Sequence, residues 1–351
     1  MKFKQAILRQ PGLVEIGNKE FSDELKENEI LLKVHRVGIC GSDIHMYSGQ
    51  HPFANTYPMI QGHEYGGEII KVGSGVSTLK PGMKATARPQ LTCEKCPPCK
   101  RGQYNICEHL AVEGCAGPEG AGQEYFVIPE ERAVIIPEGM TYDEVALIEP
   151  VAVGAHATRR PSELKGRNIV VMGAGTVGNL VAQFAVFRGA KKVLITDLFD
   201  FKLDVVNKCS SIIDTANLKR ETLNEATKRV FGDEGFQVAF EATGNQVALT
   251  EIIKEVENGG TVIIIGVYAQ NPVINMGYVG EHELNVLGSM MYLHEDYIQA
   301  VKMISEKIIK TSPLITQHFT LDKYQEAYEY IRENGEKVVK VMIDVVGNEN
   351  D

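Results

Sequence analysis

The sequence contains no tryptophan, no low-complexity tract and no hydrophobic run long enough to cross a membrane. Basic residues are in the minority, since 36 Lys and Arg against 46 Asp and Glu give a formal charge of −10. Nucleic-acid binding needs a basic face, which this balance does not favour. The N-terminal residues also lack the apolar core of a signal peptide. We therefore expect a cytoplasmic protein whose partner is neither a membrane nor a nucleic acid.

The length and the residue pattern predict two domains. A chain of 351 residues is longer than one hydrophobic core usually organises. Residues 1–150 contain short apolar runs broken by Gly and Pro, which indicates mainly β-strands. From about residue 141 the pattern becomes helical, and it begins with a capping box at Thr141 and Glu144.

From residue 168 onward, strands and helices alternate regularly. Strands are predicted at 168–173, 192–197, 236–243, 260–266 and, as an edge strand, 284–289, with helices at 176–188, about 200–208 and about 246–257. This order predicts an α/β fold with a doubly wound parallel sheet. The tail is predicted to form helices at about 295–308 and 322–333 and a last strand at 338–343.

A glycine motif with residues Gly173, Gly175 and Gly178 lies directly between the first of these strands and its helix. Glycines at this spacing allow a tight turn, the close approach of a pyrophosphate and close packing of helix on strand. Asp197 ends the next strand, 19 positions after Gly178, where the ribose hydroxyls of a dinucleotide should lie. The motif therefore predicts a dinucleotide site.

Asp197 also bears on which dinucleotide binds. Its carboxylate would accept hydrogen bonds from the 2′- and 3′-hydroxyls and repel a 2′-phosphate, so NAD is favoured over NADP. Asp200 adds to this repulsion, whereas the cation of Lys202 could tolerate a phosphate.

Four of the seven cysteines form a cluster, at Cys93, Cys96, Cys99 and Cys107. In a reducing compartment such a cluster indicates metal ligands rather than disulfides. Four thiolates at short spacing suit a closed tetrahedral zinc site, which leaves no open position for a substrate and is therefore structural. An iron–sulfur cluster and a nucleic-acid-binding zinc ribbon remain as alternatives.

A second candidate metal site lies in the stretch 38–64, where Cys40, His63 and Glu64 follow strand-like residues. A thiolate, an imidazole and a carboxylate could meet around one divalent metal, most plausibly zinc. Taken alone, such residues are more often a packed thiol and an ordinary strand end than a metal site.

The chain resembles the zinc-containing medium-chain dehydrogenase/reductase superfamily over essentially its full length. The stretch 62–76 (GHEYGGEIIKVGSGV) is similar to the zinc signature of that family, and the four-cysteine cluster and the glycine motif follow at the expected distances. The resemblance implies a GroES-like catalytic domain from residues 1–151 and 290–351, with a structural zinc lobe at about 90–110. It implies a Rossmann domain at 152–289.

The resemblance also implies roles for individual residues in the catalytic domain. Cys40 and His63 would hold a catalytic zinc. At the position where the alcohol dehydrogenase branch has a second cysteine this chain has Glu149, as in the polyol branch. Glu149 would bind the metal directly or through water, and Glu64 is the adjacent candidate that would exchange with it as the substrate enters. The alternative is that both carboxylates hydrogen-bond to the metal ligands without binding the metal themselves.

Proton transfer and cofactor contacts are likewise implied by the resemblance. Ser42 would take the proton of the substrate hydroxyl, and His45 would pass it to solvent. Besides the glycines and Asp197, the residues that match cofactor contacts of the family are Thr176, Val177, Thr243, Gly266, Val267 and Ser289.

The substrate is predicted less closely. Segments 50–64, 146–160 and 241–246 resemble dehydrogenases of hexonic acids such as L-gulonate or L-galactonate, and sorbitol, sugar-alcohol-phosphate and threonine dehydrogenases share the same framework. An anionic substrate would need a cation, for which Arg88, Arg159 and Arg160 are available. Relatives are usually homodimers or homotetramers. A catalytically silent dinucleotide-binding protein is the alternative from another class.

Overall fold

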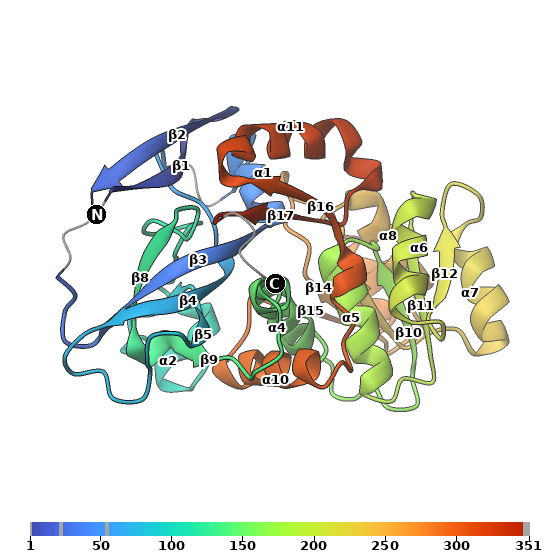
Figure 1. Ribbon diagram of the computed structural model, residues 1–351. Coiled ribbons are helices and arrows are strands. Elements are labelled where there is room, and N and C mark those ends of the chain that lie inside the picture. Colours follow the sequence, from blue (N-terminus) through green and yellow to red (C-terminus); the bar gives the residue numbers. More distant parts are fainter. Residues whose placement is uncertain (1, 21–23, 53–55, 347–351) are drawn as a thin grey trace.

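The chain forms two large sheets of different kinds, which lie side by side (Figure 1). The computed structural model describes residues 2–20, 24–52 and 56–346. Residues 53–55 of the polar loop that precedes His63 therefore lie outside the described residues. None of the helices in the described part of the chain has the length and apolar character needed to span a membrane.

One sheet has six strands, all parallel, in the order β12-β11-β10-β13-β14-β15. The strands are β10 (Asn168–Met172), β11 (Lys192–Asp197), β12 (Asp214–Asn217), β13 (Val238–Glu241), β14 (Thr261–Ile264) and β15 (Asn285–Gly288). The helices that follow them are α5 (Thr176–Phe187), α6 (Asp200–Cys209), α7 (Leu223–Phe231), α8 (Gln246–Glu255) and α9 (Met276–Glu281). The predicted α/β fold is confirmed.

Both faces of this sheet are buried, because successive side chains of its strands enter different cores. Val170 and Met172 pack with α7 and α8, whereas Ile169 and Val171 pack with α5 and α6. Helices on both faces are what a doubly wound parallel sheet requires.

Strand β12 and the helices α7 and α9 were not predicted from the sequence. Three of the four residues of β12 are polar, so the strand lacks the apolar run that marks its neighbours. Helix α7 begins with a capping box, in which Thr222 and Glu225 bond each other's backbone amides.

The other sheet has the order β16-β17-β3-β4-β5-β9, with β8 paired to β3. Its strands are β3 (Glu29–Ile39), β4 (Glu64–Val72), β5 (Lys84–Ala87), β8 (Tyr125–Pro129), β9 (Ala133–Ile135), β16 (Ile315–Thr320) and β17 (Lys340–Asp344). Strand β17 pairs antiparallel with β3, so that Val341 lies opposite Ile39. The two ends of the chain therefore build one sheet, and β17 reaches the end of β3 where Cys40 follows.

Smaller elements complete this half of the molecule. They are the hairpin β1 (Lys2–Gln10) and β2 (Leu13–Glu20), the pair β6 (Gln90–Leu91) and β7 (Ala111–Val112), and the helices α1 (Gly41–Tyr47), α2 (Pro97–Lys100), α3 (Tyr142–Ala146), α4 (Ile148–Ala157), α10 (His294–Ser305) and α11 (Tyr324–Asn334). The predicted capping box starts α3, since Thr141 and Glu144 bond each other's backbone amides. The boundary predicted at 151/152 falls inside α4, which packs against both α5 and α10 (Figure 1).

Candidate active site

Cys40, His63 and Glu64 come together where β3 ends and β4 begins. The antiparallel register places Gly38 opposite Glu64, and Cys40 then caps helix α1. One ligand atom from each of the three residues lies within 4.8 Å of the others. A Cβ at Gly38 would approach Oε2 of Glu64 to 2.2 Å, so glycine there makes room for the carboxylate. A thiolate, an imidazole and a carboxylate at this spacing suit zinc.

Asp43 lies directly behind His63. Its Oδ1 is 3.5 Å from Nδ1 of His63, and its Oδ2 accepts a hydrogen bond of 2.8 Å from the backbone amide of Cys40. Burial by itself would lower the pKa of His63, but the charge of Asp43 and the neighbouring Cys40 raise it well above the usual value. A carboxylate at the distal nitrogen orients a metal-binding imidazole. Asp43 was not predicted as a site residue, although its position three residues after Cys40 could have identified it as one.

Lys340 is a further residue of the site that was not predicted. Its Nζ donates to Oε1 and Oε2 of Glu64 at 2.8 and 2.6 Å and to the carbonyl of Ile39 at 2.9 Å. Burial alone would lower the pKa of Lys340, but the charges of Glu64 and Cys40 raise it. The ammonium group therefore stays protonated and partly compensates the anionic ligands.

Glu149, in the first turn of α4, lies beside this triad. The close set of candidate ligands among the described residues comprises Cys40, His63 and Glu64, whereas Glu149 acts on His63 through its charge. Burial raises the pKa of Glu149 to about 7, and a positive charge on His63, where that ring is protonated, would oppose this shift. The buried phenol of Tyr292 is its neighbour and was not predicted.

Ser42 and His45 lie on helix α1, which Cys40 caps. A spacing of three residues places them on the same side of the helix, next to the candidate ligands. Both side chains are half-buried, and burial lowers the pKa of His45. A neutral imidazole at the edge of the site can accept a proton and release it to solvent.

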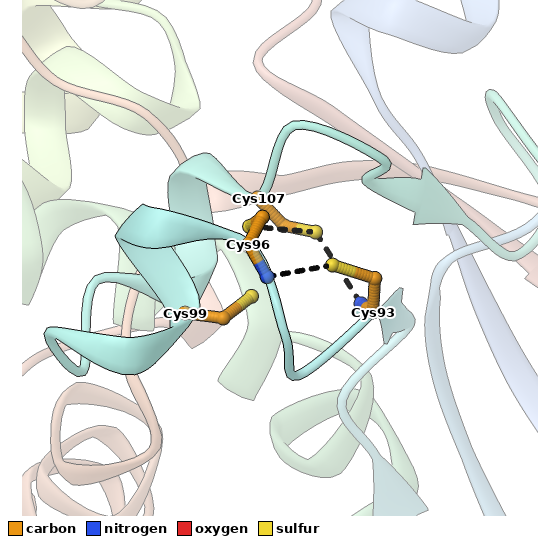
Figure 2. Close-up of side chains that lie close together, drawn as sticks. All are labelled: Cys93, Cys96, Cys99 and Cys107. Carbon is orange, nitrogen blue, oxygen red and sulfur yellow. Dashed lines mark hydrogen bonds between the residues drawn. The ribbon is translucent and has the colours of Figure 1, made fainter.

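The four clustered cysteines converge in a lobe beside the β6–β7 pair, as Figure 2 shows. Cys96 caps helix α2, and Pro97 and Pro98 form its first turn. The amides of Cys93 and His109 donate to Sγ of Cys107, both at 3.3 Å. Burial by itself would raise the pKa of Cys96, but hydrogen bonds from backbone amides lower it, which favours the thiolate. Four close sulfurs held by amide donors fit a tetrahedral metal.

The predicted cofactor residues meet at the carboxyl edge of the parallel sheet. Gly173 has φ of +97°, and a Cβ at Gly178 would approach the carbonyl oxygen of Gly173 to 1.8 Å, so both positions require glycine. Gly175 caps α5, and a Cβ there would contact nothing. This open helix N-terminus suits a pyrophosphate.

Asp197 ends β11 next to that turn. Its carboxylate accepts hydrogen bonds from the amides of Ala174 at 2.8 Å and Leu198 at 2.7 Å. Asp200 instead pairs with Arg220, so its charge is compensated. Nζ of Lys202 lies 5.5 Å from the ring centre of Phe199, at the same end of the sheet.

The remaining predicted cofactor residues follow strands β10, β13, β14 and β15. The hydroxyl of Ser289 is buried and has no hydrogen-bond partner among the described residues, as expected of a group that awaits a ligand. Thr176 donates to the carbonyl of Val339 at 2.8 Å and so ties α5 to the segment that leads into β17. The other predicted cofactor residues at the carboxyl edge of the parallel sheet are Val177, Thr243, Gly266 and Val267.

Comparison with known proteins agrees with this geometry. The alcohol dehydrogenase GroES-like domain matches residues 26–138, and the zinc-binding dehydrogenase domain matches residues 176–306. Sorbitol dehydrogenase of Bacillus subtilis is 32% identical over 343 residues, which cover 97% of this chain and 96% of that protein. L-galactonate-5-dehydrogenase of Escherichia coli is 31% identical over 318 residues, covering 90% of this chain and 92% of that protein.

A solved structure supports the same assignment. An oxidoreductase/dehydrogenase of unknown specificity from Escherichia coli superposes with a TM-score of 0.92 at 28% identity, covering 99% of this chain and 100% of that one. The predicted GroES-like and Rossmann folds are thus confirmed. The chain belongs to the zinc-containing medium-chain dehydrogenase/reductase superfamily, in its branch of polyol and sugar-acid dehydrogenases.

Proposed function

We propose that this dehydrogenase oxidises a secondary hydroxyl of a hexonic acid of the L-gulonate or L-galactonate type, with NAD as hydride acceptor. The observation that carries the proposal is the convergence of Cys40, His63 and Glu64 within 4.8 Å, beside the buried Glu149. A zinc ion bound there would act as a Lewis acid on the substrate hydroxyl.

The chain's own residues would complete the reaction. Ser42 accepts the hydroxyl proton, and His45 passes it to solvent, because a proton retained in a closed site would block turnover. Bound NAD would supply the two-electron acceptor: the hydride of the substrate carbon would reduce it to NADH while the secondary alcohol is oxidised to a ketone. The hydroxyl proton would pass from Ser42 to His45 and then to solvent. Asp43 keeps the His63 ring oriented meanwhile.

Asp197 supports the proposed preference for NAD over NADP. Its carboxylate is held by backbone amides at the end of β11, where a 2′-phosphate would meet a fixed negative charge. Since Asp200 is compensated by Arg220, the repulsion depends mainly on Asp197.

We also propose two zinc ions per chain, the second one structural. The support is the closed set of Cys93, Cys96, Cys99 and Cys107, which leaves no open position for a substrate. Metal analysis of the purified protein, with iron measured alongside zinc, tests both the count and the iron–sulfur alternative.

An anionic substrate is supported by the state of Arg88. Arg159 pairs with Asp296 at 2.7 Å, and Arg160 donates to the carbonyl of Gly288 at 2.9 Å. Nε of Arg88, by contrast, is buried and has no hydrogen-bond partner among the described residues. The charge of Arg88 also acts on Tyr292, the neighbour of Glu149. Arg88 is therefore the proposed partner of the substrate carboxylate.

A homo-oligomer is supported by the edge of the parallel sheet. Strand β15 is the last strand on that side, and no other described strand pairs with its outer edge. An unpaired edge can pair with a second copy of itself across a two-fold axis. Light scattering on the purified protein would distinguish a dimer or tetramer from a monomer.

The proposed activity is tested with purified protein, NAD or NADP, and a panel of hexonic acids, neutral polyols, polyol phosphates and L-threonine. We expect NAD reduction with a hexonic acid, and Cys40→Ser should abolish it while NAD binding remains. Cys209→Ser, which alters a packed thiol of α6, is the matched control and should stay active. Full activity in Cys40→Ser would overturn the mechanism, and a preference for neutral polyols would overturn the substrate.

A further inference from the structure

The segment 290–294, which leads from β15 to α10, has an unusual backbone. Met291 has φ of +45°, in the left-handed region that residues with a side chain seldom adopt. Such a conformation persists only where surrounding contacts enforce it. Next in the chain is Tyr292, which is fully buried beside Glu149.

Three hydrogen bonds reach the segment from the four-cysteine lobe (residues 90–110). Asn105 Nδ2 donates to the carbonyl of Met290 at 2.8 Å, and Gln90 Nε2 donates to the carbonyl of Tyr292 at 2.8 Å. The amide of His294 donates to the hydroxyl of Tyr104 at 2.5 Å. Met290, Tyr292 and His294 are thus each hydrogen-bonded to the lobe.

Both amide side chains are well placed to fix a conformation. Gln90 is 5% exposed and Asn105 is 6% exposed, so water does not compete for the carbonyls that they bond. Gln90 lies in β6, directly before the first cysteines, and Asn105 lies between Cys99 and Cys107. Their positions therefore depend on how the lobe folds around its four sulfurs.

The same contacts extend to the helix that carries Glu149. Nδ2 of Asn105 lies 3.4 Å from Nε2 of His156, near the end of α4. Nδ1 of His156 lies 2.8 Å from Oδ2 of Asp296, which also accepts a hydrogen bond of 3.0 Å from the amide of Leu293. Lobe, segment and α4 thus meet at Asn105.

We propose that the four-cysteine lobe positions the substrate site, with Gln90 and Asn105 as positioning residues that hold segment 290–294 and thereby place Tyr292 against Glu149. The lobe would then be more than a stabilising element remote from the reaction. Its effect on substrate binding rests on the proposed function, whereas its hold on the segment does not.

The test compares Gln90→Met with Gln183→Met. Met is close to Gln in size, so Gln90→Met removes the donor without burying a charge. Gln183 is also 5% exposed and also donates to a carbonyl, that of Lys310 at 3.1 Å, but it lies in α5. Asn105→Leu breaks the second contact and serves as an independent variant should Gln90→Met fail to fold.

Two readouts are taken for each variant. Hydrogen exchange followed by mass spectrometry reports the amides of 290–294, and steady-state kinetics report KM for the best substrate of the panel and for NAD. For Gln90→Met and Asn105→Leu we expect at least tenfold faster exchange in that segment and at least fivefold higher substrate KM. KM for NAD and the zinc content should be unchanged, and Gln183→Met should alter neither readout at this site.

Exchange and substrate KM equal to those of Gln183→Met would overturn the proposal. Faster exchange with an unchanged substrate KM would also overturn it, because the lobe would then hold the segment without positioning the site. If the wild-type protein oxidises nothing in the panel, the proposed function fails, and unchanged exchange in the variants would still show that the lobe does not hold the segment.

Discussion

Lys340 donates two hydrogen bonds to the carboxylate of Glu64, at 2.8 and 2.6 Å, with both side chains almost completely buried. The pair joins the last strand of the chain to the first residue of β4. Breaking a buried ion pair leaves one charge without compensation, which is more costly than never having formed the pair.

Lys340→Met should therefore lower the free energy of unfolding by about 3–5 kcal/mol, because Glu64 would remain buried and unpaired. Denaturant unfolding measures the change. The exposed Lys302, 3.9 Å from Glu306, is the control, and Lys302→Met should cost less than about 0.5 kcal/mol. Adding Glu64→Gln should recover part of the loss, and strictly additive losses would contradict a direct pair.

Asp43→Asn should weaken zinc binding by roughly 10–100-fold, because the His63 ring loses the carboxylate that orients it. The rate of zinc release to a chromogenic chelator measures the effect. Asp322→Asn, which alters an exposed pair with Lys4, should leave the rate unchanged. A wild-type release rate in Asp43→Asn would show that Asp43 has no part in holding the imidazole.

Asp197→Ala should reduce NAD affinity by about 1.5–3 kcal/mol, which is roughly a ten- to hundredfold change, because the ribose hydroxyls lose a charged acceptor. Affinity for NADP should fall less, since the repulsion of the 2′-phosphate is removed as well. Isothermal titration calorimetry with each cofactor gives both constants. Asp200→Ala should leave the ratio near the wild-type value, and the opposite pattern would assign cofactor choice to Asp200.

His318 should add a small pH dependence to stability. Its Nδ1 lies 2.9 Å from Oδ1 of Asp344, and this contact raises the pKa of His318 above its usual value. A raised pKa in the folded state means that the stabilisation is fully present below pH ~6.5 and is lost as pH rises through the folded-state pKa.

His318→Gln should therefore cost more stability at pH 6 than at pH 8. The side chain is 37% exposed, so solvent screening limits the difference to about 0.5 kcal/mol. Urea unfolding of both proteins at the two pH values measures it. An equal cost at both pH values would show that the pair with Asp344 does not depend on the charge of His318.

Features that depend on residues close together in the chain could be predicted before the structure was known. The glycine turn at Gly173–Gly178, the spacing of the four lobe cysteines and the capping box at Thr141 are local patterns, and the structure has each of them. Regular alternation of strands and helices likewise predicted the parallel sheet, because helical and strand periods can be read within about ten residues.

Only the tertiary structure placed Lys340 against Glu64, Asp43 behind His63 and Tyr292 beside Glu149. Lys340 and Glu64 are 276 positions apart in the chain, and the register of β17 on β3 brings them together. Such a distant pairing leaves no periodic pattern in the sequence. Tertiary structure also distinguished Glu64 from Glu149 as neighbours of Cys40 and His63. Glu64 lies in the close set with Cys40 and His63 because the register of β4 on β3 brings it there.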